Sequence, residues 1–408
     1  MQYKKPDIFY YRLTQAASQI FATCVFRRQV LRNEIKKAKG PFVVIANHQA
    51  AYDFVNLIGI CRRPMSFVIS NSFYQSLPIK GILDKLGVIP KQQFQTSSTD
   101  LKKIRSVILA GEPVAIYPAG LMCEDGLPTP TPTATGKLLK WLGVDVYMAK
   151  VSGTYFAMPK WASGFRPGKT TLDVYKLFSK EDLEAMDIDE VWKQTKQALQ
   201  FDAYREQEQL RVKYRKGDQL QGLENVLYRC PHCGTDYSIA VKDGNTLYCK
   251  NCGYAQTSDK YGFLHKSSAV GPELRYVSDW SRLIYDAEKE ALSQGIANVL
   301  SAKTRIHMVD TRKNKYAEAG YGTVTLNGEH FLLEGVLHQE PIQLRIPIAG
   351  FPTLPFSPGK YIEIQDGPTI YRCVLEDGKL AMKFINMVKI FHEINHPEKL
   401  PEKSRCHC

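Results

Sequence analysis

Short apolar runs alternate with amphipathic stretches through the first half of the chain. Their β-branched composition is typical of buried strands, and they cover residues 42–46, 86–91, 112–117 and 146–151. Residues 95–111, between two of these runs, carry apolar side chains at helical spacing and end at Gly111. Alternating strands and helices predict an α/β domain with a largely parallel or mixed sheet, which we assign to residues 33–220.

The second half of the chain has a β-rich pattern. A helix is predicted over residues 275–300, and it precedes β-like runs at 321–326, 330–337, 342–348, 361–365 and 369–375. Hairpin turns are predicted at Asn327-Gly328, Asp366-Gly367 and Asp377-Gly378. A last helix covers 380–394. The pattern predicts a small antiparallel β domain over residues 270–400, closed by a C-terminal helix and similar in architecture to pleckstrin-homology-like domains.

Four cysteines lie between these two parts in a Cys-x2-Cys-x15-Cys-x2-Cys pattern: Cys230, Cys233, Cys249 and Cys252. This spacing is typical of a structural zinc site. Four thiolates without an open position favour structural, tetrahedral Zn²⁺ over catalytic zinc, and rubredoxin-like iron is the alternative. Two disulfides are disfavoured because no secretory signal is visible. We therefore predict a zinc ribbon over residues 225–262.

The N-terminal segment, residues 1–32, has the pattern of an amphipathic helix. Apolar residues recur at helical spacing, namely Phe9, Leu13, Ala16, Ala17, Ile20, Phe21 and Cys24. The flanking cations are Lys4, Lys5, Arg12, Arg27, Arg28 and Arg32. Such a helix suits the interfacial zone of an anionic membrane surface. The alternative is a helix that packs on the core of its own domain.

The net charge favours an anionic partner. The 408 residues include 54 Lys and Arg against 41 Asp and Glu, a formal charge of +13. The anionic partners that fit this charge are lipid headgroups, phosphorylated acceptors, coenzyme A and nucleic acid. The basic residues are spread along the chain without a known nucleic-acid-binding motif, so nucleic acid is disfavoured. Without a spanning apolar segment or a signal peptide, we expect a cytoplasmic protein, peripheral on the inner face of the membrane.

Candidate chemistry begins directly after the first apolar run, at His48 and Asp53. An aspartate that accepts the Nδ1 proton of a histidine fixes its tautomer and stabilises the imidazolium, so Nε2 can deprotonate a hydroxyl. The spacing alone is weak evidence because short motifs recur by chance. The alternative is a loop histidine beside an aspartate that caps a helix.

The four apolar blocks, in this order, resemble the glycerolipid acyltransferase family, typified by 1-acylglycerol-3-phosphate acyltransferases. The resemblance covers roughly residues 30–200. It is carried by the His-x4-Asp block, a block that ends at Lys91, the block Tyr117-Pro118-Ala119-Gly120, and residues 146–154. The family's usual glutamate in the third block is replaced by Ala119, and Glu124 is the candidate to take its part. A proline-rich segment, 127–136, follows and is expected to form a rim loop beside the site.

The resemblance implies a membrane-associated O-acyltransferase. It would transfer a fatty acyl group from a thioester, acyl-CoA or acyl-carrier protein, to the hydroxyl of a lysophospholipid-like acceptor, 1-acylglycerol-3-phosphate or a related lipid. His48 would be the general base and Asp53 its orienting partner. Candidate substrate-binding residues are Lys91, Tyr117, Pro118, Gly120 and Glu124, with Arg166 and Lys169 from a basic, turn-rich loop. Solvated cations and an ordinary turn glycine are the structural alternatives.

Two further points bear on the reaction. The chain has no Gly-x-Ser-x-Gly elbow, so a covalent acyl-enzyme is not suggested. The competing hypothesis is a non-enzymatic scaffold that binds nucleic acid or lipid, which the net charge, the cysteine pattern and the β-rich tail would also fit.

Overall fold

A computed structural model describes the chain except for residues 1–4, 94–96, 215–217, 297, 311–314 and 397–408. The predicted N-terminal cation Lys4 and the last residues of the predicted β domain, 397–400, therefore lie outside the described residues. Contacts divide the chain into two compact units. The first comprises Met1–Gln221, Val241–Tyr248 and Tyr254–Ser278, and the second Gly222–Ala240, Cys249–Gly253 and Asp279–Cys408.

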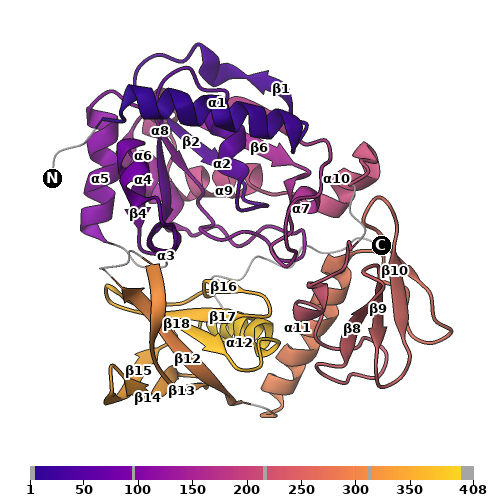
Figure 1. Ribbon diagram of the computed structural model, residues 1–408. Helices are drawn as coiled ribbons and strands as arrows, with labels where there is room; N and C mark the ends of the chain where they lie inside the picture. The colour runs from indigo at the N-terminus through magenta and orange to yellow at the C-terminus, as the bar shows by residue number, and fades with distance from the viewer. Residues whose placement is uncertain (1–4, 94–96, 215–217, 297, 311–314, 397–408) are drawn as a thin grey trace. The chain divides into compact units, whose positions relative to one another are not determined.

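The first unit is built on a seven-stranded sheet in the order β1-β7-β6-β2-β5-β3-β4 (Figure 1). The strands are β1 Gln29–Asn33, β2 Val43–Ala46, β3 Ser66–Ser70, β4 Ile89–Lys91, β5 Val114–Ile116, β6 Val146–Ser152 and β7 Thr171–Phe178. Neighbouring strands pair in parallel, and the β6–β7 pair alone is antiparallel. The predicted mixed α/β sheet is therefore confirmed.

Helices cover both faces of this sheet. Along β2, Val44 and Ala46 belong to one apolar core, and Val43 and Ile45 belong to the other. The first core includes side chains of α1 (Ile8–Cys24) and α2 (Asp53–Ile58), and the second includes those of α5 (Ser98–Leu109), α6 (Ala134–Leu142), α8 (Lys180–Ala185) and α9 (Ile188–Ala198). Burial on both faces explains why the strands have continuous apolar runs rather than alternating ones.

Shorter helices complete the first unit. They are α3 Asn71–Ser76, α4 Lys80–Lys85, α7 Thr154–Ala157 and α10 Ala203–Leu210. The carboxyl ends of β2, β3, β4, β5 and β6 lie at one edge of the sheet because these strands run parallel. At that edge, His48 and Tyr117 follow β2 and β5, and Lys91 is the last residue of β4.

A four-stranded sheet of order β11-β10-β9-β8 follows the first pair of cysteines, and Cys249 ends its strand β9. Its strands are β8 Ile239–Lys242, β9 Thr246–Cys249, β10 Ala255–Ser258 and β11 Leu264–Lys266, and α11 (Val277–Ser293) follows. A tight turn at Asp243 and Gly244, both with positive φ, connects β8 to β9. This is the hairpin ribbon that the spacing of the cysteines predicts.

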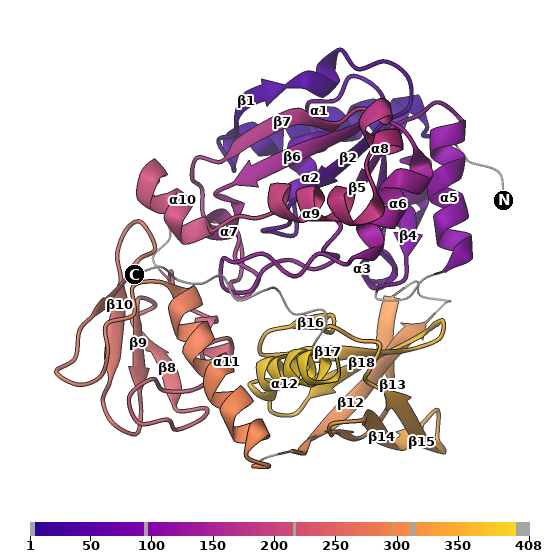
Figure 2. The same cartoon turned by 180° about the vertical axis from the view of Figure 1, so that it is seen from behind.

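The second unit contains an antiparallel sheet in the order β15-β14-β13-β12-β18-β17-β16 (Figure 2). Its strands are β12 Leu300–Asp310, β13 Lys315–Leu326, β14 His330–Leu337, β15 Glu340–Pro347, β16 Phe356–Ser357, β17 Tyr361–Asp366 and β18 Thr369–Leu375. Helix α12, Leu380–Asn395, buries Phe384, Ile385 and Val388. The predicted β domain with a closing helix is confirmed, and its similarity to pleckstrin-homology-like domains stays a prediction.

Several elements differ from the sequence-based expectation. Five strands were not predicted, namely β1, β3, β7, β12 and β16. The N-terminal helix ends at Cys24 and α11 ends at Ser293, both earlier than expected. Asp377-Gly378 does not form a hairpin, because it leads into α12 and Asp377 accepts a hydrogen bond from the Lys379 amide. The β14–β15 hairpin instead turns at His338 and Gln339, which adopt positive φ without a glycine.

Candidate active site and cysteine cluster

The residues after β2 form a tight turn around one carboxylate oxygen. Asp53 Oδ2 lies 3.0 Å from His48 Nδ1 and accepts hydrogen bonds from the main-chain amides of Gln49 (2.7 Å) and Ala50 (2.9 Å). Asp53 is fully buried as the first residue of α2. It binds amides of the turn before the helix, so it is not the helix cap of the alternative hypothesis, and the N-cap is Tyr52.

This arrangement orients the imidazole. With Nδ1 directed at the carboxylate, Nε2 is the ring nitrogen that remains for a substrate proton. The His48 side chain is 19% exposed, and its ring lies against that of Tyr117 with centroids 4.6 Å apart. Burial, reinforced by the charge of Asp53, raises the pKa of Tyr117 well above its ordinary value. Tyr117 therefore remains a neutral phenol that packs against the imidazole of His48.

The loop after β5 is hydrogen-bonded to the turn that carries His48. The Gly120 amide donates to Tyr117 O over 3.0 Å, and Gly120 adopts φ +69°, a conformation that favours glycine. The Cys123 amide donates to His48 O over 3.2 Å. Glu124 is the next residue and is buried. The third sequence block, Tyr117-Pro118-Ala119-Gly120, and the following Cys123 are thus placed beside His48.

A small pocket opens beside the imidazole. His48 and Ala119 line it, together with Pro128, Thr129 and Thr131 of the proline-rich loop. Leu199 and Phe201 also line it. Its free volume of about 10 Å³ matches a single water molecule. The proline-rich loop therefore lies at the rim of the site, as expected, and a substrate needs this rim to move or binds across its surface.

The three candidate cations differ in their surroundings. Lys91 ends β4, where burial lowers its pKa against the opposing effect of Asp100, and its ammonium donates to Gln92 O over 2.9 Å. Lys169 is exposed. Arg166 is buried, with its guanidinium 4.8 Å from the centre of the Trp161 ring and a 2.6 Å hydrogen bond to Gln219 O.

Burial lowers the pKa of Arg166 to about 10. These contacts favour a structural role for Arg166 over contact with a substrate phosphate, because the guanidinium already has partners in the interior. That Lys91 and Lys169 bind substrate stays a prediction.

Two residues that the sequence interpretation passed over hold the turn in place. The Asn47 amide group binds both the carbonyl and the amide of Val151 in β6, each over 2.8 Å. Gln49 Oε1 accepts hydrogen bonds from Thr154 Oγ1 and from the Tyr155 amide. The available signal was the position of two amide residues on either side of His48, where buried polar side chains need partners.

Part of the chain is similar to a known protein family. Residues 27–157 match the model of the acyltransferase family. This part of the chain, which carries His48 and Asp53, is therefore similar to acyltransferases. The match includes every candidate residue from His48 to Glu124, and Arg166 and Lys169 lie beyond it. No curated protein matches the chain significantly.

Solved structures were also compared. The 1-acyl-sn-glycerophosphate (LPA) acyltransferase PlsC from Thermotoga maritima is 18% identical, with a TM-score of 0.41, over 50% of this chain and 81% of that chain. The Ran binding domain of the nuclear complex component Nup2 from Ashbya gossypii is 14% identical, with a TM-score of 0.20, over 24% of this chain and 98% of that chain. The PH domain of human oxysterol binding protein-related protein 11 is 13% identical, with a TM-score of 0.17, over 27% of this chain and 93% of that chain.

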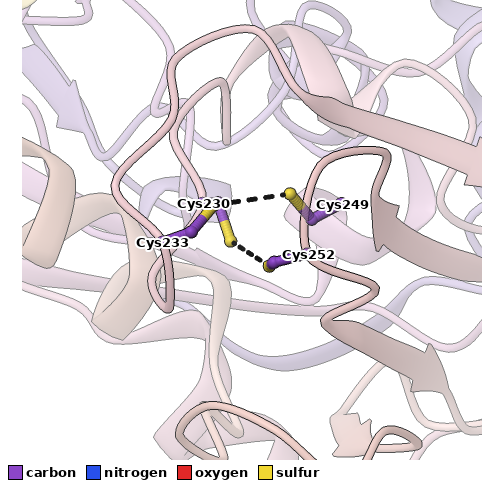
Figure 3. Close-up of side chains that lie close together, drawn as sticks. All are labelled: Cys230, Cys233, Cys249 and Cys252. Carbon is purple, nitrogen blue, oxygen red and sulfur yellow. Dashed lines mark hydrogen bonds between the residues drawn. The ribbon is translucent and has the colours of Figure 1, made fainter.

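Beyond the acyltransferase domain, the four predicted cysteines meet in one cluster (Figure 3). Their sulfur atoms all lie within 4.8 Å of one another, with Cys230–Cys252 and Cys233–Cys249 at 3.7 Å. Tetrahedral Zn–S bonds of about 2.3 Å place the sulfurs about 3.8 Å apart, so the cluster fits such an ion. The separation is far beyond the roughly 2 Å of a disulfide. The donor set has no open position and suits a structural ion.

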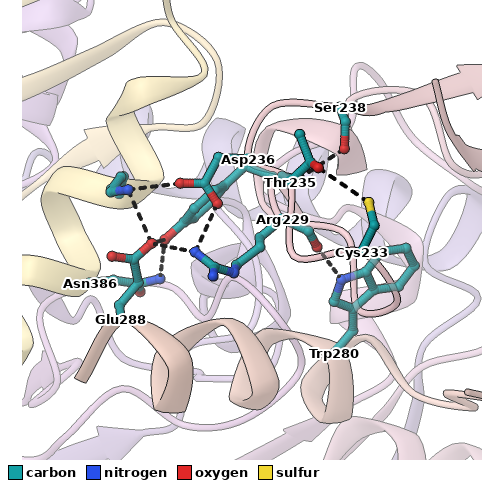
Figure 4. A network of polar contacts seen from close by, with 10 residues as sticks. Arg229, Cys233, Thr235, Asp236, Ser238, Trp280, Glu288 and Asn386 are labelled. Atoms are coloured by element: carbon teal, nitrogen blue, oxygen red, sulfur yellow. Dashed lines mark hydrogen bonds and ion pairs between the residues drawn. The ribbon is translucent and has the colours of Figure 1, made fainter. Parts of the chain in front are cut away.

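A network of charges supports the first knuckle of the cluster, which is the turn that carries Cys230 and Cys233 (Figure 4). Arg229 and Asp236, which flank Cys230 and Cys233, pair over 3.1 Å. Lys383 of α12 lies 2.8 Å from Asp236 and 3.2 Å from Glu288 of α11. Glu288 is 3% exposed and also accepts a hydrogen bond from Tyr228. The network therefore connects the knuckle to both helices of the second unit.

The indole of Trp280, fully buried on α11, adds a neutral contact to the same knuckle. Its Nε1 donates to Arg229 O over 2.9 Å. The knuckle, α11 and α12 thus share hydrogen bonds as well as ion pairs, and we expect them to open together.

Replacing Lys383 with Met tests this network. The substitution leaves the buried Glu288 with the more distant Arg229 as its remaining cation, so the second unit should lose about 3 kcal/mol. Hydrogen exchange of α11 and α12 is the measurement, and both should exchange faster. Lys289→Met is the control, because its pair with Glu393 is exposed and worth at most about 1 kcal/mol. Equal exchange in the two variants would contradict the network.

Proposed function

We propose that the protein is a membrane-associated O-acyltransferase that transfers a fatty acyl group to a lysophospholipid-like acceptor, 1-acylglycerol-3-phosphate or a related lipid. The observation that carries this proposal is the buried, hydrogen-bonded His48–Asp53 pair inside a domain of the acyltransferase family. The donor is a thioester, either acyl-CoA or acyl-carrier protein. The match to acyltransferases over residues 27–157 favours an enzyme over the non-enzymatic scaffold.

In the proposed reaction, His48 Nε2 removes the proton of the acceptor hydroxyl as its oxygen attacks the thioester carbonyl. Asp53 stabilises the imidazolium that forms. The tetrahedral intermediate then collapses, the carbon–sulfur bond breaks, and the imidazolium returns its proton to the leaving thiolate. Lys91 and Lys169 are the proposed contacts for phosphate groups, since a lysine ammonium binds phosphate as a point charge.

The surface of α1 supports docking to a membrane. Phe9, Leu13 and Ile20 are 69%, 60% and 65% exposed, whereas Tyr11 and Ala22 are buried against the domain. The predicted apolar stripe is therefore not the face that packs on the core. Within the described residues, no helix is long and apolar enough to cross a bilayer. We propose that this stripe enters the interface of an anionic membrane, on its cytoplasmic face.

The cations near α1 should contribute less to membrane affinity than the sequence suggested. Lys5 pairs with Glu112, Arg32 pairs with Asp173, and Arg28 donates to the main chain of Asn56. Cations that already have partners attract anionic lipid less strongly. The apolar stripe should therefore provide most of the membrane affinity.

We also propose that the cysteine cluster holds one structural Zn²⁺, with Cys230, Cys233, Cys249 and Cys252 as ligands. The hydroxyl of Thr235, 3.3 Å from Cys233 Sγ, lowers the pKa of that thiol and favours the thiolate, the form that binds metal. The bound ion would fix the two knuckles against each other, and it would take no part in acyl transfer.

The first test concerns the proposed base. His48→Ala should lower kcat at least about 100-fold without loss of fold, because it removes the proton acceptor. Asp53→Asn should also impair turnover. The control is His265→Ala, because His265 belongs to an exposed His–Asp pair 3.1 Å apart and should be dispensable. Steady-state assays and circular dichroism provide the readout, and near-normal turnover of the His48 variant would overturn the mechanism.

The second test concerns the metal. Freshly reduced protein should contain about one Zn per chain by elemental analysis, and Cys230→Ser should lose it and open the ribbon. Cys24→Ser, a change of an exposed cysteine on α1, is the control and should keep the metal. Protein without bound metal would refute the assignment, and bound iron would favour the rubredoxin-like alternative.

The third test concerns the membrane. Leu13→Ser combined with Ile20→Ser should weaken binding to phosphatidylglycerol-containing vesicles at least about 10-fold, because both substitutions remove apolar area from the proposed interface. Leu109→Ser, which changes an exposed leucine of α5 in the other helix layer, is the control. Co-sedimentation is the measurement. If the double variant and the control bound vesicles equally, α1 would not be the docking surface.

A further inference from the structure

The side chain of Gln49 is buried directly beside the proposed base. Gln49 is 0% exposed, and its Oε1 accepts from Thr154 Oγ1 at 3.3 Å and from the Tyr155 amide at 3.2 Å. Its Nε2 has no hydrogen-bond partner among the described residues. A buried amide donor without an acceptor is costly, so the surroundings of this group call for an explanation.

Glu206 of α10 supplies the complementary group. Its carboxylate lies 3.6 Å from Lys150 Nζ, and Oε2 is buried without a hydrogen-bond partner among the described residues. Burial raises the pKa of Glu206, and interactions with Ser152, Lys150 and Gln49 oppose that rise. Both groups lie near the end of β6 and the start of α7, because Glu206 pairs with Lys150 and Gln49 binds Thr154 and Tyr155. An amide donor and a carboxylate acceptor are thus both buried and unsatisfied beside the turn that carries His48.

We propose that Glu206 is a positioning residue for the reaction and acts through Gln49. Its carboxylate accepts the hydrogen bond of Gln49 Nε2 when the site closes on substrate, since hydrogen bonds of a free enzyme often tighten in the complex. This inference rests on the proposed acyl transfer. Glu206 lies outside the residues that match the family model, 27–157, so it is a contribution of the helices that follow the matched part.

The geometry shows how a residue of α10 affects the base. Gln49 donates its main-chain amide to Asp53 Oδ2, so a displacement of Gln49 displaces the carboxylate that orients His48. On the other side, Asn47 is bound to Val151 of β6, the strand that also carries Lys150. His48 is thus held between two anchored amides. A displacement of about 1 Å at a catalytic group reduces the rate by up to about 100-fold.

Four variants test the inference. Glu206→Leu should lower kcat about 10-fold and leave KM nearly unchanged, because orientation fails while substrate binding persists. Glu206→Gln retains an acceptor oxygen and should restore most of the activity. Gln49→Leu should lose at least as much as Glu206→Leu, and the double variant Gln49→Leu/Glu206→Leu should be no worse than Gln49→Leu alone. Additive losses would overturn the pairing.

The matched control is Glu184→Leu on α8, where the carboxylate is exposed and pairs with Lys180 only at the surface. An independent readout uses protein labelled with ¹⁵N-histidine. The ring resonances of His48, assigned from His48→Ala, should shift in Glu206→Leu and stay unchanged in Glu184→Leu. Unchanged His48 resonances in Glu206→Leu would overturn the inference whether or not transfer is detected. If the His48 resonances shift in Glu206→Leu but the wild-type protein transfers no acyl group, the result would count against the proposed function alone.

Discussion

The hydrogen bonds that converge on Asp53 Oδ2 are the interaction on which the rest of the site depends. One oxygen takes the imidazole of His48 and the amides of Gln49 and Ala50, so the turn and the side chain it presents are fixed together. The surrounding sheet makes this possible, because β2 lies between the parallel strands β5 and β6. Their carboxyl ends bring the loops with Cys123 and Thr154 to the same turn. The imidazole is therefore held before any substrate arrives, which is the preorganisation that catalysis requires.

The second unit depends on a different constraint, the convergence of four thiols on one point. A hairpin ribbon of this length has little apolar core of its own, and a bound ion would compensate for that. The charges around Arg229 extend the constraint to α11 and α12. The cluster is thereby joined to the helices that pack the β domain, and its metal would stabilise more than the ribbon itself.

Much of the fold follows from simple patterns in the sequence. Buried strands with continuous apolar runs predicted the α/β sheet, and the cysteine spacing predicted the cluster. The contact of His48 with Asp53 was also predictable, because five residues span the turn into α2. Strand β12 was not predicted because its buried positions include Ala302 and Thr304, which weaken the alternation of apolar and polar residues. The β14–β15 turn escaped because it contains no glycine.

Side-chain environments set by distant contacts were harder to predict. Arg166 lies in a loop of turn residues and cations that is typical of an exposed segment. Its burial depends on Trp161 and on the carbonyl of Gln219, 53 positions away in the sequence. Gln49 and Glu206 come from distant parts of the chain, and no local pattern marks either residue as part of the site.

The most direct measurement of the central claim is mass spectrometry of acyl transfer by the purified full-length protein. Isotope-labelled acyl-CoA and acyl-carrier protein would each be offered with a panel of lysophospholipids in vesicles, using wild-type protein and His48→Ala. The account predicts that at least one lysolipid gains the labelled acyl group, with release of free thiol, and that the His48 variant forms almost none. Folded, metal-loaded wild-type protein that acylates no acceptor from either donor would contradict it.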